Sequence, residues 1–129
     1  MTSLVFNIIE KKISSNDRIL QIGISFKGNV PDIRNSKAAE LAKLFIDKNY
    51  NINVYDTIVD SAEVNKSFSI KLSKLAGRYD VIIIAVSHNF LTDQSIDFLK
   101  YIKSSSKIFD ITGKYKNMFS GKNIKYWSL

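Results

Sequence analysis

The chain has 129 residues, 45% of them hydrophobic, and it contains no cysteine. This length predicts a single domain with a sizeable core, and the lack of cysteine excludes disulfides, thiolate metal sites and a cysteine nucleophile. Nineteen basic and 12 acidic side chains give a net charge of +7, which favours anionic partners. The lysines are scattered, so a solvated lysine-rich surface accounts for this charge better than nucleic-acid binding does.

No apolar run is long enough to span a membrane, and the first residues show no signal-peptide pattern. The sequence therefore predicts a cytoplasmic protein that makes no use of a membrane. Residues 4–13 have the apolar spacing of an amphipathic helix. A polar break at residues 14–17 separates this helix from the rest of the chain.

Strands and helices alternate after this break. Residues 18–25 form a nearly continuous apolar strand, and residues 36–48 carry a helical stripe whose start Asn35 or Ser36 can cap. Residues 57–66 are polar and irregular, and Gly77 is placed to end a helix as its C-terminal cap. The remaining expected elements are a strand at 52–56, a helix at 70–76, strands at 80–87 and 107–111, a helix at 92–103, a loop or single turn at 114–121, and a strand at 123–127.

This alternation with short loops predicts an α/β fold of three layers, a Rossmann-like doubly wound parallel sheet of about five strands. The most economical strand order is 2-1-3-4-5. Open sheets of this kind bind ligands at the carboxyl ends of the strands, where the first and third strands diverge.

The loop after the first strand, residues 23–36, combines several chemically active side chains at that edge. Lys27 and Arg34 suit a diphosphate, as a point charge and a bidentate donor, and Phe26 could stack on a base or cover a sugar. The alternative is structural: Asp32 and Arg34 pair to stiffen the loop while Phe26 enters the core. Residue types alone leave the two interpretations open.

His88, the only histidine, follows the apolar strand that ends near residue 87 and lies at the same edge. A ligand contact is open to it, although a loop-ordering role is commoner for a single histidine. No metal site is expected, and Ser25, Ser36 and Ser87 lack the base that would mark a nucleophile. The spacing G-x-G-x-x-G is absent, so no independent nicotinamide-cofactor site is indicated.

Four segments together resemble the C-terminal, UDP-binding domain of the UDP-glucose/GDP-mannose dehydrogenase family. The first, Leu20-Gln-Ile-Gly-Ile-Ser-Phe-Lys-Gly-Asn-Val-Pro-Asp-Ile-Arg-Asn-Ser36, is similar to the signature G-L-[ST]-F-K-x-x-x-x-D-x-R-x-S, and Val54-Tyr-Asp56 is similar to V-Y-D-P. Gly77-Arg-Tyr-Asp-Val-Ile-Ile-Ile-Ala-Val-Ser-His-Asn-Phe90 and Lys107-Ile-Phe-Asp-Ile-Thr-Gly113 complete the match. Gly28 stands where the family commonly has an acidic residue, and the histidine resembles the branch acting on UDP-N-acetylated hexosamines.

The resemblance implies that this chain binds a UDP-sugar for an NAD-dependent 6-dehydrogenase that makes UDP-uronic acids for surface polysaccharides. Phe26 and Lys27 would contact the UDP moiety, Asp32 would organise the loop, and Arg34 would lie near the cofactor. Residues 1–13 would be the end of a helix linking domains, and residues 14–129 the UDP-sugar-binding domain.

The resemblance also implies that the complete enzyme has an N-terminal NAD-binding domain and a central helical domain, a catalytic cysteine, and a homodimeric state. This chain has neither the fingerprint nor the cysteine, so by itself we expect it to bind no NAD and to be inactive. The alternative is a stand-alone nucleotide- or protein-binding Rossmann-like module without enzyme activity.

Overall fold

The computed structural model describes residues 2–119 and 124–129. Within these residues, five parallel strands form one sheet in the order β2-β1-β3-β4-β5. The strands are β1 (Arg18–Ile22), β2 (Asn51–Tyr55), β3 (Tyr79–Ile84), β4 (Ile102–Asp110) and β5 (Lys125–Ser128). The predicted α/β class, the parallel sheet and the strand order are confirmed.

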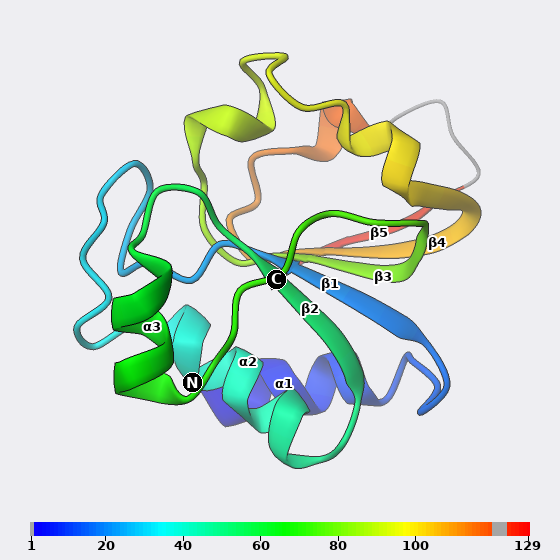
Figure 1. The fold of residues 1–129 in the computed structure, drawn as a ribbon. Helices are drawn as coiled ribbons and strands as arrows, with labels where there is room; N and C mark the ends of the chain where they lie inside the picture. The colour runs from blue at the N-terminus through cyan, green and yellow to red at the C-terminus, as the bar shows by residue number, and fades with distance from the viewer. Residues whose placement is uncertain (1, 120–123) are drawn as a thin grey trace.

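Two helices, α1 (Thr2–Glu10) and α2 (Lys37–Asp47), lie side by side across one face of the sheet (Figure 1). The ring centroids of Phe6 from α1 and Phe45 from α2 are 4.7 Å apart. Both rings are buried in a cluster with the side chains that β1, β3 and β4 direct to this face, which are Ile19, Val81, Ile83 and Phe109. α1 therefore packs on the same core as the rest of the chain. The predicted domain division at residues 13 and 14 stays a prediction.

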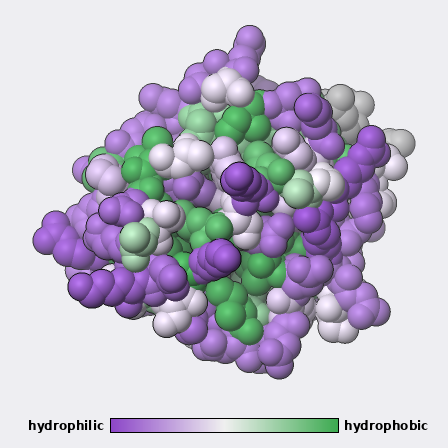
Figure 2. All heavy atoms as spheres, in the orientation of Figure 1, coloured by the Kyte–Doolittle hydropathy of each residue, from purple (hydrophilic) through white to green (hydrophobic). Residues whose placement is uncertain are grey.

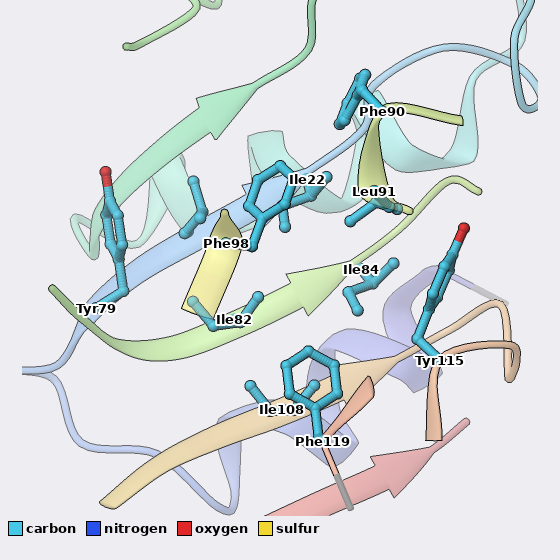
Figure 3. Packing of buried hydrophobic residues seen from close by; sticks show 11 residues of the cluster. Ile22, Tyr79, Ile82, Ile84, Phe90, Leu91, Phe98, Ile108, Tyr115 and Phe119 are labelled. Atoms are coloured by element: carbon cyan, nitrogen blue, oxygen red, sulfur yellow. The ribbon is translucent and has the colours of Figure 1, made fainter. Parts of the chain in front are cut away.

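The other face of the sheet is covered by irregular segments and short 3-10 helices at Asn89–Leu91, Phe98–Tyr101 and Lys116–Met118 (Figure 1). The predicted helix at 92–103 is therefore wrong. Figure 3 shows Phe90, Leu91 and Phe98 lying directly on the isoleucines of β1 and β3. These side chains form the third layer without an α-helix, and β4 begins as early as Ile102.

The predicted helix at 70–76 is also wrong, since these residues have no regular structure. A helix forms earlier in the chain instead: α3 (Ser61–Phe68) lies in the segment expected to be irregular. Asp60 caps its start by accepting a hydrogen bond from the Ala62 N–H at 2.9 Å. Ser69, with φ of 57°, is the left-handed residue that ends it. Gly77 has φ of +70° but lies in the turn before β3 and caps no helix.

Several predicted bounds are too long. β1 ends at Ile22 rather than at residue 25, β3 ends at Ile84 rather than at residue 87, and α1 ends at Glu10. β1 ends there because Gly23 has φ of +97°, which is not a strand conformation. A larger residue would not fit at this position, since a Cβ would lie 2.6 Å from the Val86 Cβ. Residues 120–123, where the loop 114–121 and the last strand were expected to meet, lie outside the described residues.

Ser36 caps α2 from a buried position, as the sequence predicts. Its hydroxyl accepts a hydrogen bond from the Ala39 N–H at 3.0 Å and donates one to the Ile24 carbonyl at 2.7 Å. One side chain thus starts the helix and fastens the loop that precedes it. A cap is worth about 1 kcal/mol, and a buried carbonyl left without its donor adds a cost of about 1 kcal/mol or more.

We therefore expect Ser36→Ala to lower the free energy of unfolding by about 2 kcal/mol. Asp60→Ala, which removes the exposed cap of α3, should cost about 1 kcal/mol or less. Urea denaturation of both variants measures this difference. If Ser36→Ala and Asp60→Ala lowered the free energy of unfolding equally, the hydrogen bond from the Ser36 hydroxyl to the Ile24 carbonyl would contribute nothing to stability.

Hydrophilic side chains cover most of the face shown in Figure 2, and apolar side chains are visible between them in the middle. This face is therefore largely hydrophilic. None of the helices in the described part of the chain is both long and apolar enough to traverse a lipid bilayer.

Candidate functional site

The loop of residues 23–36 leaves the carboxyl end of β1 and carries Phe26 and Lys27 on its surface. Phe26 is 55% exposed, and Lys27 is also exposed. The Phe26 N–H donates to the Asp32 carbonyl at 2.6 Å, which closes the tip of the loop. Phe26 is not part of the core, so the structural alternative for this residue is wrong. An exposed aromatic ring beside an exposed ammonium group is an arrangement that can bind a ligand.

Asp32 and Arg34 form an ion pair within the loop, as the structural alternative describes. The Arg34 Nε donates to Asp32 Oδ1 and a terminal nitrogen donates to Oδ2, each at 3.0 Å. The side-chain and backbone hydrogen bonds from Arg34 lower the pKa of the Asp32 carboxyl. The Arg34 side chain remains 84% exposed, so the pair shapes the loop and still presents a guanidinium group to solvent.

His88 is buried, and protein groups bind both of its ring nitrogens. Nε2 lies 2.9 Å from Asp56 Oδ2, and Nδ1 lies 2.9 Å from the backbone nitrogen of Asn29. A backbone N–H only donates, so Nδ1 accepts, and the ring proton resides on Nε2 and is donated to Asp56. This arrangement favours the loop-ordering role for His88 over a direct ligand contact.

Asp56 joins the ends of three strands. Its carboxylate accepts hydrogen bonds from the Ile24 N–H at 2.9 Å, from the Ile58 N–H at 2.8 Å, and from His88. Burial by itself would raise the pKa of Asp56, but these hydrogen bonds outweigh it and hold the pKa below its ordinary value. Asp56 is thus a structural anion beneath the loop.

Ser25, His88 and Asp56 superficially resemble a nucleophilic triad. The Ser25 Oγ lies 3.3 Å from His88 Nε2, the same nitrogen that donates to Asp56. Ser25 itself donates to the Lys27 carbonyl at 2.8 Å. No ring nitrogen is therefore free to take the serine proton, and all three side chains are buried. His88 is therefore not placed to act as a base for Ser25.

Asp110 organises the exit of β4 in the same way. Its buried carboxylate accepts five hydrogen bonds, from the Thr112 N–H and hydroxyl, the Gly113 N–H, the Tyr115 N–H and the Tyr126 hydroxyl. Burial would raise its pKa, but the bonds from Thr112 and Tyr126 and from the backbone hold the pKa below its ordinary value. This carboxylate has no remaining capacity for ligand chemistry.

Two hollows lie near the loops. A small apolar one of about 170 Å³ lies beside the start of α2 and is lined by Thr2, Val5, Lys37, Ala38, Leu41, Ala85 and Ile111. A larger one of about 620 Å³ lies beside the end of β2, with Tyr55, Lys74, Lys100 and Tyr101 in its wall. Phe26 and Lys27 line neither of them. Among the described side chains, no group of three or more His, Asp or Glu could hold a metal ion.

Asn29 is the residue that sequence reasoning missed. It has φ of 62°, a conformation that asparagine tolerates better than other side chains with a Cβ. The adjacent Gly28-Asn29 pair is a turn signal that could have drawn attention to it. Its contacts across 59 and 60 positions, to His88 and Asn89, could not be inferred from one sequence.

Residues 20–117 match the model of the UDP-glucose/GDP-mannose dehydrogenase family, UDP binding domain. The chain is 31% identical over 94 residues to Protein CapL of Staphylococcus aureus, covering 71% of this chain and 22% of that protein. It is 30% identical over 112 residues to the UDP-N-acetyl-D-glucosamine 6-dehydrogenase of Salmonella typhi, covering 84% of this chain and 26% of that protein.

Solved structures show the same fold. The UDP-N-acetyl-mannosamine dehydrogenase Cap5O from Staphylococcus aureus aligns with a TM-score of 0.74 at 20% identity, covering 98% of this chain and 30% of that one. The chain thus spans between about a fifth and a third of the proteins that it matches. Its sequence motifs, strand order and family match agree, and the chain belongs to the UDP-glucose/GDP-mannose dehydrogenase family, with its UDP-binding domain at residues 20–117.

Proposed function

We propose that this chain forms the UDP-sugar-binding part of an NAD-dependent nucleotide-sugar 6-dehydrogenase. That enzyme would convert the sugar's C6 alcohol to a carboxylate for surface polysaccharide synthesis, as a cytoplasmic homodimer. The observation that carries the proposal is the exposure of Phe26 and Lys27 together on a closed loop at the carboxyl edge of the sheet. The substrate is a UDP-N-acetylhexosamine, in line with the resemblance at His88 and with the names of the relatives.

Each exposed side chain of the loop has a separate role in this proposal. The Lys27 ammonium binds the diphosphate, which is the strongest charge on the ligand. The Phe26 ring covers the uridine or the sugar, where an apolar face excludes water. Arg34, held by Asp32 but 84% exposed, points its remaining donors toward the cofactor in the complete enzyme.

The residues present do not fit NAD. Gly28 packs so closely on the Ser87 backbone that a Cβ would lie 2.0 Å from the Ser87 oxygen, and it therefore does not form an open glycine cradle. Ser36 already occupies the Ala39 N–H at the start of α2. NAD and the catalytic thiol would come from the part of the enzyme that this chain does not include.

Calorimetric titration of the chain with UDP and UDP-N-acetylglucosamine tests the proposal. Lys27→Ala should weaken binding of both about ten- to a hundredfold, because a charge-assisted hydrogen bond is worth about 1.5–3 kcal/mol. Lys125→Ala is the matched control, since Lys125 is exposed at the start of β5, at the opposite edge of the sheet. It should leave the affinity unchanged.

Equal affinity of wild-type protein and Lys27→Ala for UDP would contradict the site. Salt-sensitive binding of a DNA duplex, undiminished in Lys27→Ala, would instead support a nucleic-acid binder. UDP binding by this chain without any partner would be compatible both with the part of a dehydrogenase and with the stand-alone module. Mixing the chain with a separately produced NAD-binding domain would then distinguish these two alternatives, because only the part of a dehydrogenase would support oxidation of the sugar.

A further inference from the structure

The tip of the loop that carries Phe26 and Lys27 is fastened to residues 88 and 89 through Asn29. The Asn29 N–H donates to His88 Nδ1 at 2.9 Å. The Asn29 side chain donates to Asn89 Oδ1 at 3.2 Å and accepts from the Asn89 N–H at 2.8 Å. Three hydrogen bonds therefore fix the backbone two residues after Lys27.

His88 also reaches Lys27 by a second route. The Ser25 hydroxyl donates to the Lys27 carbonyl at 2.8 Å and lies 3.3 Å from His88 Nε2. The ring thus touches the loop both before and after the pair Phe26 and Lys27. Neither of these contacts depends on a ligand.

The contact with Asn29 exists only while Nδ1 has a free lone pair. Nε2 carries the ring proton and donates it to Asp56. A side chain at position 88 must therefore offer an acceptor at the position of Nδ1 to keep this contact.

We propose that His88 is a positioning residue: its ring holds Asn29 by Nδ1 and so keeps Phe26 and Lys27 in the arrangement that binds a nucleotide diphosphate. This inference rests on the function proposed above. The affinity for a UDP-sugar therefore depends on the acceptor that His88 presents to Asn29, although His88 never touches the ligand.

The other contacts of the ring hold it in this orientation. In the part of the chain that the structure describes, Asp56 is the titratable side chain bonded to it. The other neighbours are Ser25, Asn29 and the ring of Phe90, whose centroid lies 5.0 Å away. Because Asp56 fixes Nε2, Nδ1 is left facing Asn29.

Two substitutions separate the two sides of the ring. In His88→Asn, the new amide oxygen lies near the position of Nδ1 and can still accept from Asn29. In His88→Gln, the amide nitrogen reaches the position of Nε2 and can still donate to Asp56, but no acceptor faces Asn29. Neither side chain titrates, and neither leaves a large cavity.

Binding of UDP-N-acetylglucosamine is measured by calorimetry. His88→Asn should bind nearly as the wild type does, because it keeps the acceptor for Asn29. His88→Gln should bind about three- to tenfold more weakly, the effect of one lost hydrogen bond. Wild-type affinity in His88→Gln, or a loss in His88→Asn as large as that in His88→Gln, would overturn the proposal.

A second measurement needs no ligand. In ¹H–¹⁵N NMR spectra of the free chain, the Asn29 amide should be protected from hydrogen exchange in the wild type and in His88→Asn, and unprotected in His88→Gln. An Asn29 amide that is equally protected in the wild type and in His88→Gln would refute the inference. If this NMR result is as expected but Lys27→Ala binds UDP like the wild type, the proposed function fails and the positioning of the loop stands.

Discussion

Asp110→Asn is expected to lower the free energy of unfolding at neutral pH by about 3 kcal/mol. Two of the five donors that converge on this buried carboxylate, the Tyr115 N–H and the Tyr126 hydroxyl, bind Oδ2. In asparagine, an amide occupies the site of one carboxylate oxygen and brings donors against these donors. Urea denaturation of both proteins measures the loss.

The pH dependence of this loss follows from the direction of the pKa shift. The pKa of Asp110 is below its ordinary value in the folded chain, so the unfolded chain binds a proton first as the pH falls. The stabilisation is present above the unfolded pKa of about 3.9 and is lost as the pH falls through the folded pKa. The difference between wild type and Asp110→Asn should therefore be constant above about pH 5 and shrink below about pH 4.

Two further variants check the cause. Burial and the bond to Asp110 raise the pKa of the Tyr126 hydroxyl to about 12. Tyr126→Phe removes this donor and should lower the free energy of unfolding by about 1 kcal/mol. Asp93→Asn alters an exposed carboxylate that, among the described residues, accepts its hydrogen bonds from Ser95, and stability should hardly change. A pH-independent gap between wild type and Asp110→Asn would show that the carboxylate's charge is not what stabilises the turn.

The sheet and α2 were predictable because their sequence signals are local and agree with their packing. Each strand on either side of the switch point is an apolar run, and both faces of the sheet are covered. α2 has an apolar stripe of five buried residues and a serine at its N-cap, so its predicted bounds differ by one residue at each end. Here propensity, pattern and cap all indicate the same element.

α3 was missed because it buries only one side chain, Val64, and so has no apolar stripe. The apolar residues Ile70, Leu72 and Leu75, which suggested a helix, pack on the core from a segment without regular structure. A signal was available. Asp60 is followed three residues later by Glu63, the spacing of a capping box, and Asp60 does cap the helix.

The spacing of Ile96, Leu99 and Ile102 predicts a buried helical stripe at 92–103, but these residues do not form one. Leu99 is 38% exposed. Ile102 is already the first residue of β4, where it pairs with Tyr79 of β3. The cover of this face instead comes from Phe90, Leu91 and Phe98. Large aromatic side chains on short turns can fill the space that a helix would occupy, and periodicity does not detect this.

The candidate site was predictable in its location. Sheet topology put residues 23–36 at the carboxyl edge, and the ion pair of Asp32 and Arg34 was one of the two alternatives that residue types left open. The contacts of His88 with Asp56 and Asn29 cross 32 and 59 positions of the chain. One sequence contains no signal for such pairs, because they depend on how the loops pack after the strands have assembled.

Gly28→Ala should have the largest effect on the candidate site. The new Cβ would lie 2.0 Å from the Ser87 oxygen, a backbone atom that cannot rotate away. The loop must therefore move away from the end of β3, at a cost of about 2 kcal/mol of stability, as for overpacking in a core. We expect this movement to displace Phe26 and Lys27 together, so the affinity for UDP should fall at least as far as in Lys27→Ala.

Gly77→Ala is the matched control for this prediction. Gly77 has φ of +70°, and its Cβ would meet only the end of the flexible Arg18 side chain, at 2.9 Å. This substitution should cost about 1 kcal/mol but leave the UDP affinity unchanged, since Gly77 precedes β3 at the opposite edge of the sheet. Urea denaturation and calorimetry of both variants measure the two effects separately. Wild-type affinity in a destabilised Gly28→Ala would mean that the loop's close packing on Ser87 serves only the fold, because the ligand side chains would then hold their arrangement without it.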